Sequence, residues 1–270
     1  MKHAFSLVEL SIVLVILGLL TGGILGGQAL IRAAELRAVS TEYGRYAAAA
    51  MTFRDKYFAV PGDFRDATRF WGWQVNGSNC TTNSSAAVNS AGACDGNGDG
   101  TILWDNSGAV STSREMHQFW RHLALAGLVE GTYTGLAGPT TNSADVVPGT
   151  NSPRAKLANA GWGAAQTNCG YGGGCFTTMH IANGYPPYFM FGRQWAGGGN
   201  VPGGNVLKPE EAWNIDTKMD DGRPVSGKII PLYQNSTNLC STAASATDTS
   251  ATYLLSSTTV GCSLYFLNAF

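Results

Sequence analysis

The chain has 270 residues, enough for one large domain or two modest ones with a substantial core. Seventeen basic and eighteen acidic side chains leave a formal net charge of -1, so the charge predicts no nucleic-acid partner and no attachment to anionic lipid. Charged residues make up only 13% of the chain, and it contains 35 glycines. This composition excludes disorder driven by charge repulsion.

Apolar residues gather near the N-terminus. No charged residue occurs from Leu10 to Ile31, and a helix of that length spans about 33 Å, enough to cross a hydrocarbon layer of about 30 Å. A secretory signal peptide is the alternative, but its apolar region usually has only about 7 to 15 residues and ends at a cleavage site. Lys2, before the apolar run, predicts a cytoplasmic N-terminus.

The helical pattern continues beyond the apolar run. Past it, apolar side chains recur every three or four residues and so share one stripe of a helix: Leu36, Val39, Tyr43, Tyr46, Ala50, Phe53 and Tyr57. We expect the charged residues of this stretch to lie off the stripe: Arg32, Glu35, Arg37, Glu42 and Arg45. The sequence therefore predicts one helix of about 50 residues from Phe5, ended by Pro61-Gly62, with a lipid-soluble first half and an amphipathic second half.

Glu9 lies just before the apolar run. A carboxylate in hydrocarbon is costly and indicates a functional role, although a side chain that only reaches the headgroups is the simpler alternative. Its context, Ala4-Phe5-Ser6-Leu7-Val8-Glu9, resembles the prepilin cleavage motif of type IV pilins and type II secretion pseudopilins. The resemblance covers roughly residues 1 to 60, with alanine at position 4 where the family usually has glycine.

The resemblance implies a structural subunit of a type IV pilus or pseudopilus-like filament, a helical homo-oligomer. A prepilin peptidase would cut between Ala4 and Phe5 and methylate the new Phe5 amine. Glu9 of one subunit would then pair with the Phe5 amine of a neighbour, and this pairing of two buried charges would fix the axial register. Residues 1–4 would form a leader peptide, 5–60 the transmembrane and assembly helix, and 61–270 an extracytoplasmic globular head.

Location and partners follow from the same resemblance. We expect a single-pass inner-membrane protein with a cytoplasmic N-terminus, which an inner-membrane machinery assembles into an extracellular or periplasmic filament. A minor, tip-located pilin or pseudopilin whose head binds a partner or secreted substrate is the alternative. An anchored enzyme or lectin with a fortuitous motif is a third possibility, but no catalytic sequence motif is present, so the protein is not predicted to be an enzyme.

The head is predicted to be α+β. We expect short helices at residues 63–71, 113–126 and 209–220, and strands at 188–191, 228–232, 252–255 and 263–267. Thr112 and Glu115 suit a capping box for the second helix, and Pro209 suits the first turn of the third. The predicted fold is a long N-terminal helix packed on a globular head with a small antiparallel sheet, additional short helices and long loops.

A glycine-rich acidic segment begins at Asp95. Asp95-Gly-Asn97-Gly-Asp99-Gly100-Thr101-Ile102 matches the first eight positions of an EF-hand calcium loop, but position twelve is Asn106 instead of glutamate. We therefore expect a structural Ca²⁺, as in several pseudopilins that the chain resembles, with these candidate ligands: Asp95, Asn97, Asp99, Thr101, Asp105 and Glu115. A turn with solvated acids is the alternative. A second acidic group, Asp216, Asp220 and Asp221, is interpreted as a helix end.

Six cysteines occur, an even number in a segment predicted to be extracytoplasmic, which favours disulfides. Fifteen pairings are possible, and proximity in the sequence favours three local ones: Cys80 with Cys94, Cys169 with Cys175, and Cys240 with Cys262. The last resembles the C-terminal disulfide loop of type IV pilins. A zinc site is disfavoured because no Cys-x-x-Cys occurs and the spacing of His117 and His122 does not put them on one helical face.

Overall fold

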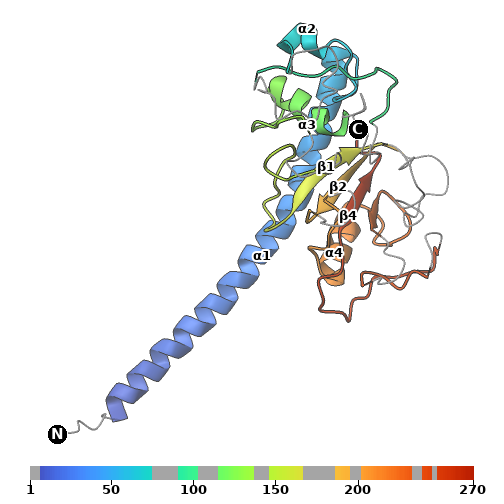
Figure 1. The fold of residues 1–270 in the computed structure, drawn as a ribbon. Coiled ribbons are helices and arrows are strands. Elements are labelled where there is room, and N and C mark those ends of the chain that lie inside the picture. Colours follow the sequence, from blue (N-terminus) through green and yellow to red (C-terminus); the bar gives the residue numbers. More distant parts are fainter. Residues whose placement is uncertain are drawn as a thin grey trace.

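The computed structural model describes residues 7–74, 91–102, 115–136, 146–166, 186–194, 202–232, 239–244 and 248–270. The described elements have the predicted α+β arrangement of a long N-terminal helix, short helices and a small antiparallel sheet (Figure 1). In chain order they are α1 (Leu7–Tyr57), α2 (Ala67–Trp71), α3 (Glu115–Leu125), β1 (Gly161–Ala165), β2 (Tyr188–Gly192), α4 (Pro209–Met219), β3 (Ile229–Pro231) and β4 (Leu264–Leu267).

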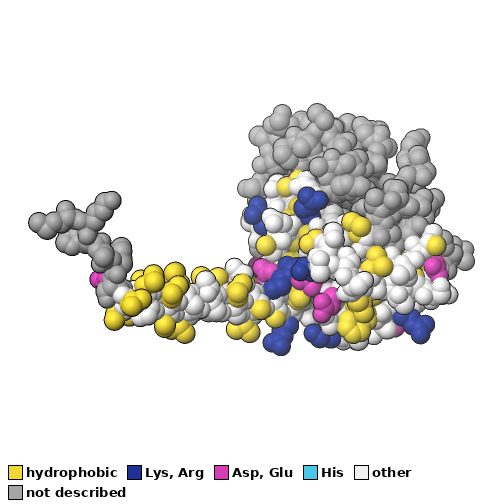
Figure 2. Space-filling view, turned by 90° about the horizontal axis from the view of Figure 1, so that it is seen from below, with side chains coloured by type: hydrophobic (Ala, Val, Ile, Leu, Met, Phe, Trp, Pro, Cys, Tyr) yellow, Lys and Arg dark blue, Asp and Glu magenta, His cyan; other side chains and the backbone are white. Residues whose placement is uncertain are grey.

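The first half of α1 projects from the head as a bare rod (Figure 1). We call residues 7–31 the rod. Its large apolar side chains are between 50% exposed, at Val13, and 86% exposed, at Leu7. Figure 2 shows hydrophobic side chains along the rod, and charged side chains gathered where it joins the head. The rod is long and apolar enough to span a membrane.

The second half of α1 packs into the head through the predicted stripe. Val39, Tyr46, Ala50 and Phe53 are buried, and Leu36, Tyr43 and Tyr57 pack against the same core. The ring of Tyr46 meets two tryptophan rings edge to face, with centroids 5.0 and 5.6 Å away. Aromatic packing therefore fixes the helix to the head, as the three-and-four spacing predicted.

The helix ends earlier, and by another cause, than the sequence suggested. Tyr57 is its last residue, four positions before Pro61. Phe58 follows with a φ of 54°, a left-handed conformation that stops a right-handed helix and that glycine usually supplies. The prediction that Pro61-Gly62 ends the helix was therefore wrong in detail.

The sheet has the order β1-β2-β4-β3, and every pair is antiparallel. Phe189 of β2 pairs with Phe266 of β4, and both rings contact Tyr43 of α1. The other face carries Tyr188 and Tyr265, whose rings lie 5.8 Å apart. All strand residues are buried, so the sheet lies inside the core with one face against α1.

Three of the four predicted strands are present within a residue or two of their expected bounds. The fourth, at 252–255, is not a strand, because Tyr253 makes only an isolated bridge to Ser241 before the chain turns. The sequence analysis missed β1, whose Gly-Trp-Gly-Ala-Ala has no β-branched residue and a single large side chain. Of the helix expected at 63–71, only the last five residues are helical. The first two residues of the helix expected at 113–126 lie outside those described.

Candidate functional site

The predicted processing site lies outside the described residues, since these begin at Leu7 and so exclude Ala4 and Phe5. Glu9 lies in the first turn of α1, exposed, at the end of the rod farthest from the head (Figure 1). The apolar run that follows separates its carboxylate from the head.

The rod joins the head at Arg32, the first charged residue after the apolar run. Its guanidinium donates two hydrogen bonds to the carboxylate of Glu211 on α4, from Nε to Oε1 at 2.6 Å and from Nη2 to Oε2 at 2.7 Å. The same Nη2 also donates to the carbonyl of Val206 at 3.1 Å. Burial raises the pKa of Glu211, but hydrogen bonds from Arg32 and the Lys208 amide outweigh it and lower the pKa below its usual value. This bidentate pair fixes the start of α4 to α1, at the base of the head.

Glu42 forms a second polar link between α1 and the head. Its side chain is buried, and its carboxylate accepts hydrogen bonds from the indole Nε1 of Trp162 at 2.8 Å and from the amide of Lys156 at 2.9 Å. The expectation that Glu42 lies off the buried stripe was wrong. Glu42 lies three residues after Val39 and four before Tyr46, which places it on the buried face of the helix. This spacing could have predicted its burial from the sequence.

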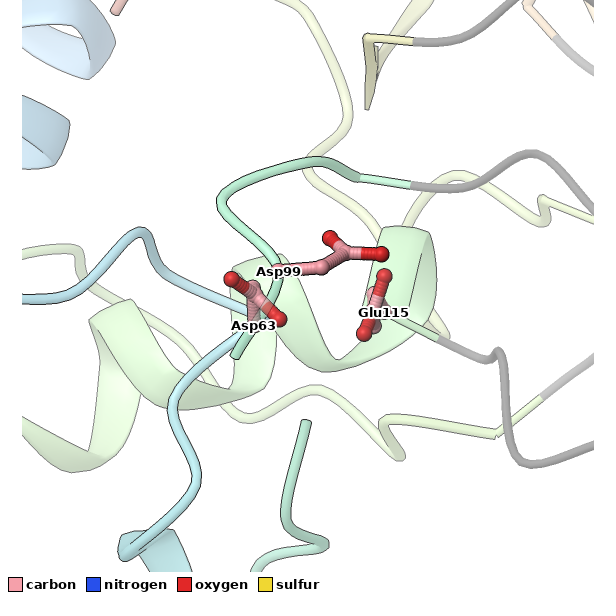
Figure 3. Close-up of side chains that lie close together, drawn as sticks. All are labelled: Asp63, Asp99 and Glu115. Atoms are coloured by element: carbon pink, nitrogen blue, oxygen red, sulfur yellow. The ribbon is translucent and has the colours of Figure 1, made fainter. Parts of the chain in front are cut away.

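Asp99 of the acidic segment forms a cluster with Asp63 and Glu115, in which one carboxylate oxygen from each residue lies within 4.8 Å of the other two. Figure 3 shows the carboxylates of Asp99 and Glu115 pointing toward each other, with Asp63 beside them. Asp63 comes from the turn after α1, Asp99 from the glycine-rich loop, and Glu115 from the first residue of α3. Sequence analysis missed Asp63 because it is far from the other two along the chain.

Tight backbone turns bring the three carboxylates together. Gly62 has a φ of 91°, and a Cβ there would collide with the carbonyl of Glu115. Asp63 then accepts hydrogen bonds from the amides of Gly98 and Gly100, and Glu115 accepts one from the amide of Asn97 at 3.0 Å. The loop is thus wrapped around carboxylates that come from outside it.

The other predicted ligands take different roles. Asp95 is not in the cluster, because its carboxylate accepts from the amide and the hydroxyl of Thr68, each at 2.8 Å. The Asn97 Oδ1 accepts a hydrogen bond from the backbone amide of Asp99, and the Thr101 hydroxyl donates to the Asp99 carboxylate. Burial raises the pKa of Asp99, but the hydrogen bonds from Thr101 and Asn97 lower it below the usual value. Asp105 lies outside the described residues.

The donor set suits a hard cation, since Ca²⁺ prefers carboxylate and carbonyl oxygens in a site of flexible geometry. Three carboxylates this close repel one another unless a cation or a proton lies between them. Their hydrogen bonds to backbone amides leave lone pairs on the oxygen atoms for an ion. The residues therefore fit calcium, with Asp63 in the place that the EF-hand pattern gave to Asp95.

The second acidic group surrounds a buried carboxylate, Asp216, near the end of α4. It accepts hydrogen bonds from the Tyr253 hydroxyl at 2.8 Å and from the Gly222 amide at 3.1 Å. Burial raises the pKa of Asp216 to about 7, and the nearby carboxylates of Asp221 and Asp220 act in the same direction. Asp220 in turn accepts from the amides of Lys228 and Ile229 at the start of β3, and these bonds give the group a structural role.

Cys240 and Cys262 form a disulfide, as their proximity in the sequence predicted. The disulfide closes a loop that contains Tyr253. The hydrogen bond from Tyr253 to Asp216 also attaches this loop to α4. The other two predicted pairs include Cys80, Cys169 and Cys175, which lie outside the described residues.

His122 is enclosed in the core and holds three segments together. Its Nδ1 accepts from the Gly62 amide at 2.9 Å, and its Nε2 lies 3.0 Å from the carbonyl of Cys94. Burial lowers the pKa of His122 to about 4, so the imidazole is neutral at neutral pH with its proton on Nε2.

No family model, no curated protein and no solved structure matches the chain.

Proposed function

We propose that the protein is a structural subunit of a type IV pilus or pseudopilus-like filament, assembled through α1. The observation that carries the proposal is the division of one unbroken helix into a bare apolar rod and a half that is buried in its own head. Such a rod needs a bilayer or other apolar rods around it, because exposure of so much apolar surface to water is unfavourable.

The prepilin-like motif supplies the chemistry of assembly. Cleavage by a prepilin peptidase between Ala4 and Phe5 would give Phe5 a methylated, positively charged amine. The Glu9 carboxylate of a neighbouring subunit would then have a partner of opposite charge within the packed rods. A buried pair approaches a net energy of zero whereas a single buried charge costs several kcal/mol, about 3 to 5, so the pairing selects one register.

The same proposal gives the protein its location. Before assembly it is a single-pass inner-membrane protein with its head outside the cytoplasm, and inner-membrane machinery transfers it into a periplasmic or extracellular filament. The Arg32–Glu211 pair supports this arrangement, since it begins where the apolar run ends and would lie at the lipid headgroups. A structural Ca²⁺ held by Asp63, Asp99 and Glu115 belongs to the proposal.

A minor subunit at the filament tip is the second candidate. The distal end of the head, opposite the rod, exposes Phe58 (94%), Phe70 (61%) and Trp73 (48%). Exposed aromatic side chains of this size mark surfaces that bind something else. A tip subunit would present this end to a partner, and it would be present in filaments at far lower amounts than a major subunit.

The test is the substitution Glu9→Gln in the native host, with Glu130→Gln as the control because Glu130 is exposed on the head. We expect both variants in the membrane fraction at wild-type level, but only the control in sheared filaments. The intact mass of the filament subunit should correspond to a methylated chain that begins at Phe5. Wild-type filament yield from Glu9→Gln, or assembled subunits that retain Met1, would overturn the proposal.

A further inference from the structure

The distal end of α1 contains a pocket that no role in filament assembly requires. Its volume is about 810 Å³, within the usual range for small-molecule sites. It lies between the last turn of α1, the turn that leads to α2, and the acidic loop. We propose that this pocket binds a neutral saccharide, through these side chains: Arg54, Asp55, Tyr57, Phe58 and Arg65.

Charged groups in this pocket are available to a ligand. Among the residues that the structure describes, the side chains of Arg54 and Asp55 make no hydrogen bond and no ion pair. Arg65 uses only its Nε, which donates to the carbonyl of Asn97, so both terminal nitrogens remain. The pocket thus offers hydrogen-bond donors from two guanidinium groups and acceptors from one carboxylate.

Phe58 at the pocket rim adds an apolar surface. Its side chain is 94% exposed, and so it contributes almost no packing to the fold. Its backbone has a φ of 54°, a conformation in which a bulky side chain is an outlier. The Phe58 side chain therefore adds little to the packing of the free protein, and strained residues cluster at ligand sites.

The mixture of groups selects the chemical class of the ligand. An organic anion would meet the carboxylate of Asp55, and an organic cation would meet the guanidinium groups of Arg54 and Arg65. A purely apolar ligand would remove water from all of these charges without replacing it. A neutral saccharide satisfies both signs, because its hydroxyls donate to carboxylates and accept from guanidinium groups, while its C–H face can lie on an aromatic ring.

The pocket is placed where an external ligand could reach it. Residues of the last turn of α1 line it, and this end of the helix is the one farthest from the rod (Figure 1), so a bilayer around the rod would leave the pocket open. Binding does not require assembly, and the inference goes beyond the proposed filament role without depending on it. The test can therefore use the full chain as a monomer in a membrane.

The experiment is saturation-transfer NMR on the full chain in phosphatidylcholine nanodiscs, which contain no sugar. The probes are cellobiose, N,N′-diacetylchitobiose and xylobiose. We expect transfer to at least one of them, and at least a fivefold loss of affinity in each of Arg54→Ala, Asp55→Ala and Phe58→Ala. Arg37→Ala, which removes an exposed charge of α1 outside the pocket, should bind as the wild type does.

Each other result contradicts the saccharide site. No transfer to any of the three probes overturns it, and so does transfer that survives all three pocket substitutions. Equal loss in the Arg37→Ala control would mean a general charge effect and would also overturn it. Thermal melting of every variant, compared with the wild type, identifies a variant that has lost its fold. Because the filament yield of the native host is measured separately, failure here leaves the assembly proposal intact.

Discussion

Trp162 donates its indole N–H to the Glu42 carboxylate at 2.8 Å, which joins the first strand of the sheet to the middle of the long helix. The other oxygen of the carboxylate accepts from the Lys156 amide. Since Glu42 is buried, both of its bonds form away from water, where a hydrogen bond to a charged group is strong and an unmatched donor is costly.

Glu42→Gln should destabilise the head by about 1–3 kcal/mol, because the new amide N–H₂ would face an N–H donor. Urea or thermal unfolding of the full chain in nanodiscs measures the change. Glu130→Gln serves as the control, since an exposed substitution of this kind alters stability by no more than about 0.5 kcal/mol. Equal stabilities for the two variants would show that the Glu42 bonds contribute nothing.

Calcium should raise the melting temperature of the full chain, and chelation should lower it. At a free ion concentration about 100 times the dissociation constant, the gain is about 2.7 kcal/mol. Asp63→Asn and Asp99→Asn should lose this response because both residues belong to the three-carboxylate cluster. Elemental analysis that finds no calcium, together with an unchanged melting temperature, would remove the ion from the proposal.

Asp95→Asn separates two possible calcium sites. In the EF-hand pattern Asp95 is the first ligand, whereas in the structure it binds Thr68. We therefore expect Asp95→Asn to lower stability and yet keep the calcium response. Loss of the response in this variant would favour the EF-hand arrangement over the observed cluster.

Asp216 should make the stability of the head depend on pH. Its folded pKa of about 7 is raised above its usual value of 3.8, so the folded chain holds a proton that the unfolded chain releases. The stabilisation is complete below about pH 4 and is lost as the pH rises to 7. The pKa of His122 is lowered, so the unfolded chain binds the proton more tightly than the folded one. This residue therefore makes the stability of the head rise with pH between about pH 4 and 6.5, the opposite of the effect of Asp216.

The substitution Asp216→Asn isolates the first effect, because it leaves His122 unchanged. We subtract the melting temperature of the variant from that of the wild type, and we expect this difference to be larger at pH 5 than at pH 8. Tyr253 and the carboxylates of Asp220 and Asp221 surround the same group and are common to both proteins. A difference that stays constant across this range would contradict the raised pKa.

Phe58→Gly should stabilise the head by about 0.5–1 kcal/mol, since glycine adopts a positive φ without steric cost. Phe58→Ala keeps the Cβ and therefore the strain, so it should bring no such gain. Denaturant unfolding of both variants measures the difference. If the alanine variant gains as much as the glycine variant, the backbone at position 58 is not strained.

Local patterns were sufficient to predict several elements. The three-and-four spacing from Leu36 to Tyr57 predicted the buried face of α1, and runs of aromatic and β-branched residues predicted β2, β3 and β4. In contrast, β1 is rich in glycine and alanine, and only its pairing with β2 makes it a strand. Intrinsic preference cannot detect a strand that tertiary contacts impose.

The acidic cluster shows the same limit at a site. Asp99 belongs to a recognisable local motif, and Glu115 could be proposed because a helix begins there. Asp63 joins them through backbone amides of Gly98 and Gly100, and its position depends on the close approach of Gly62 to α3. Such a contact between distant segments is set by the packed fold, so spacing along the chain could not reveal it.

The way α1 lies along the head determines how the molecule would carry a mechanical load. Its contacts with the head extend from Arg32 to Tyr57, about 38 Å of helix. Tension along the helix axis would therefore act in shear on the whole interface at once, so that its bonds would have to break together and not one after another. A chain held in this way would resist a pull on the rod along the helix axis far better than a pull across that axis.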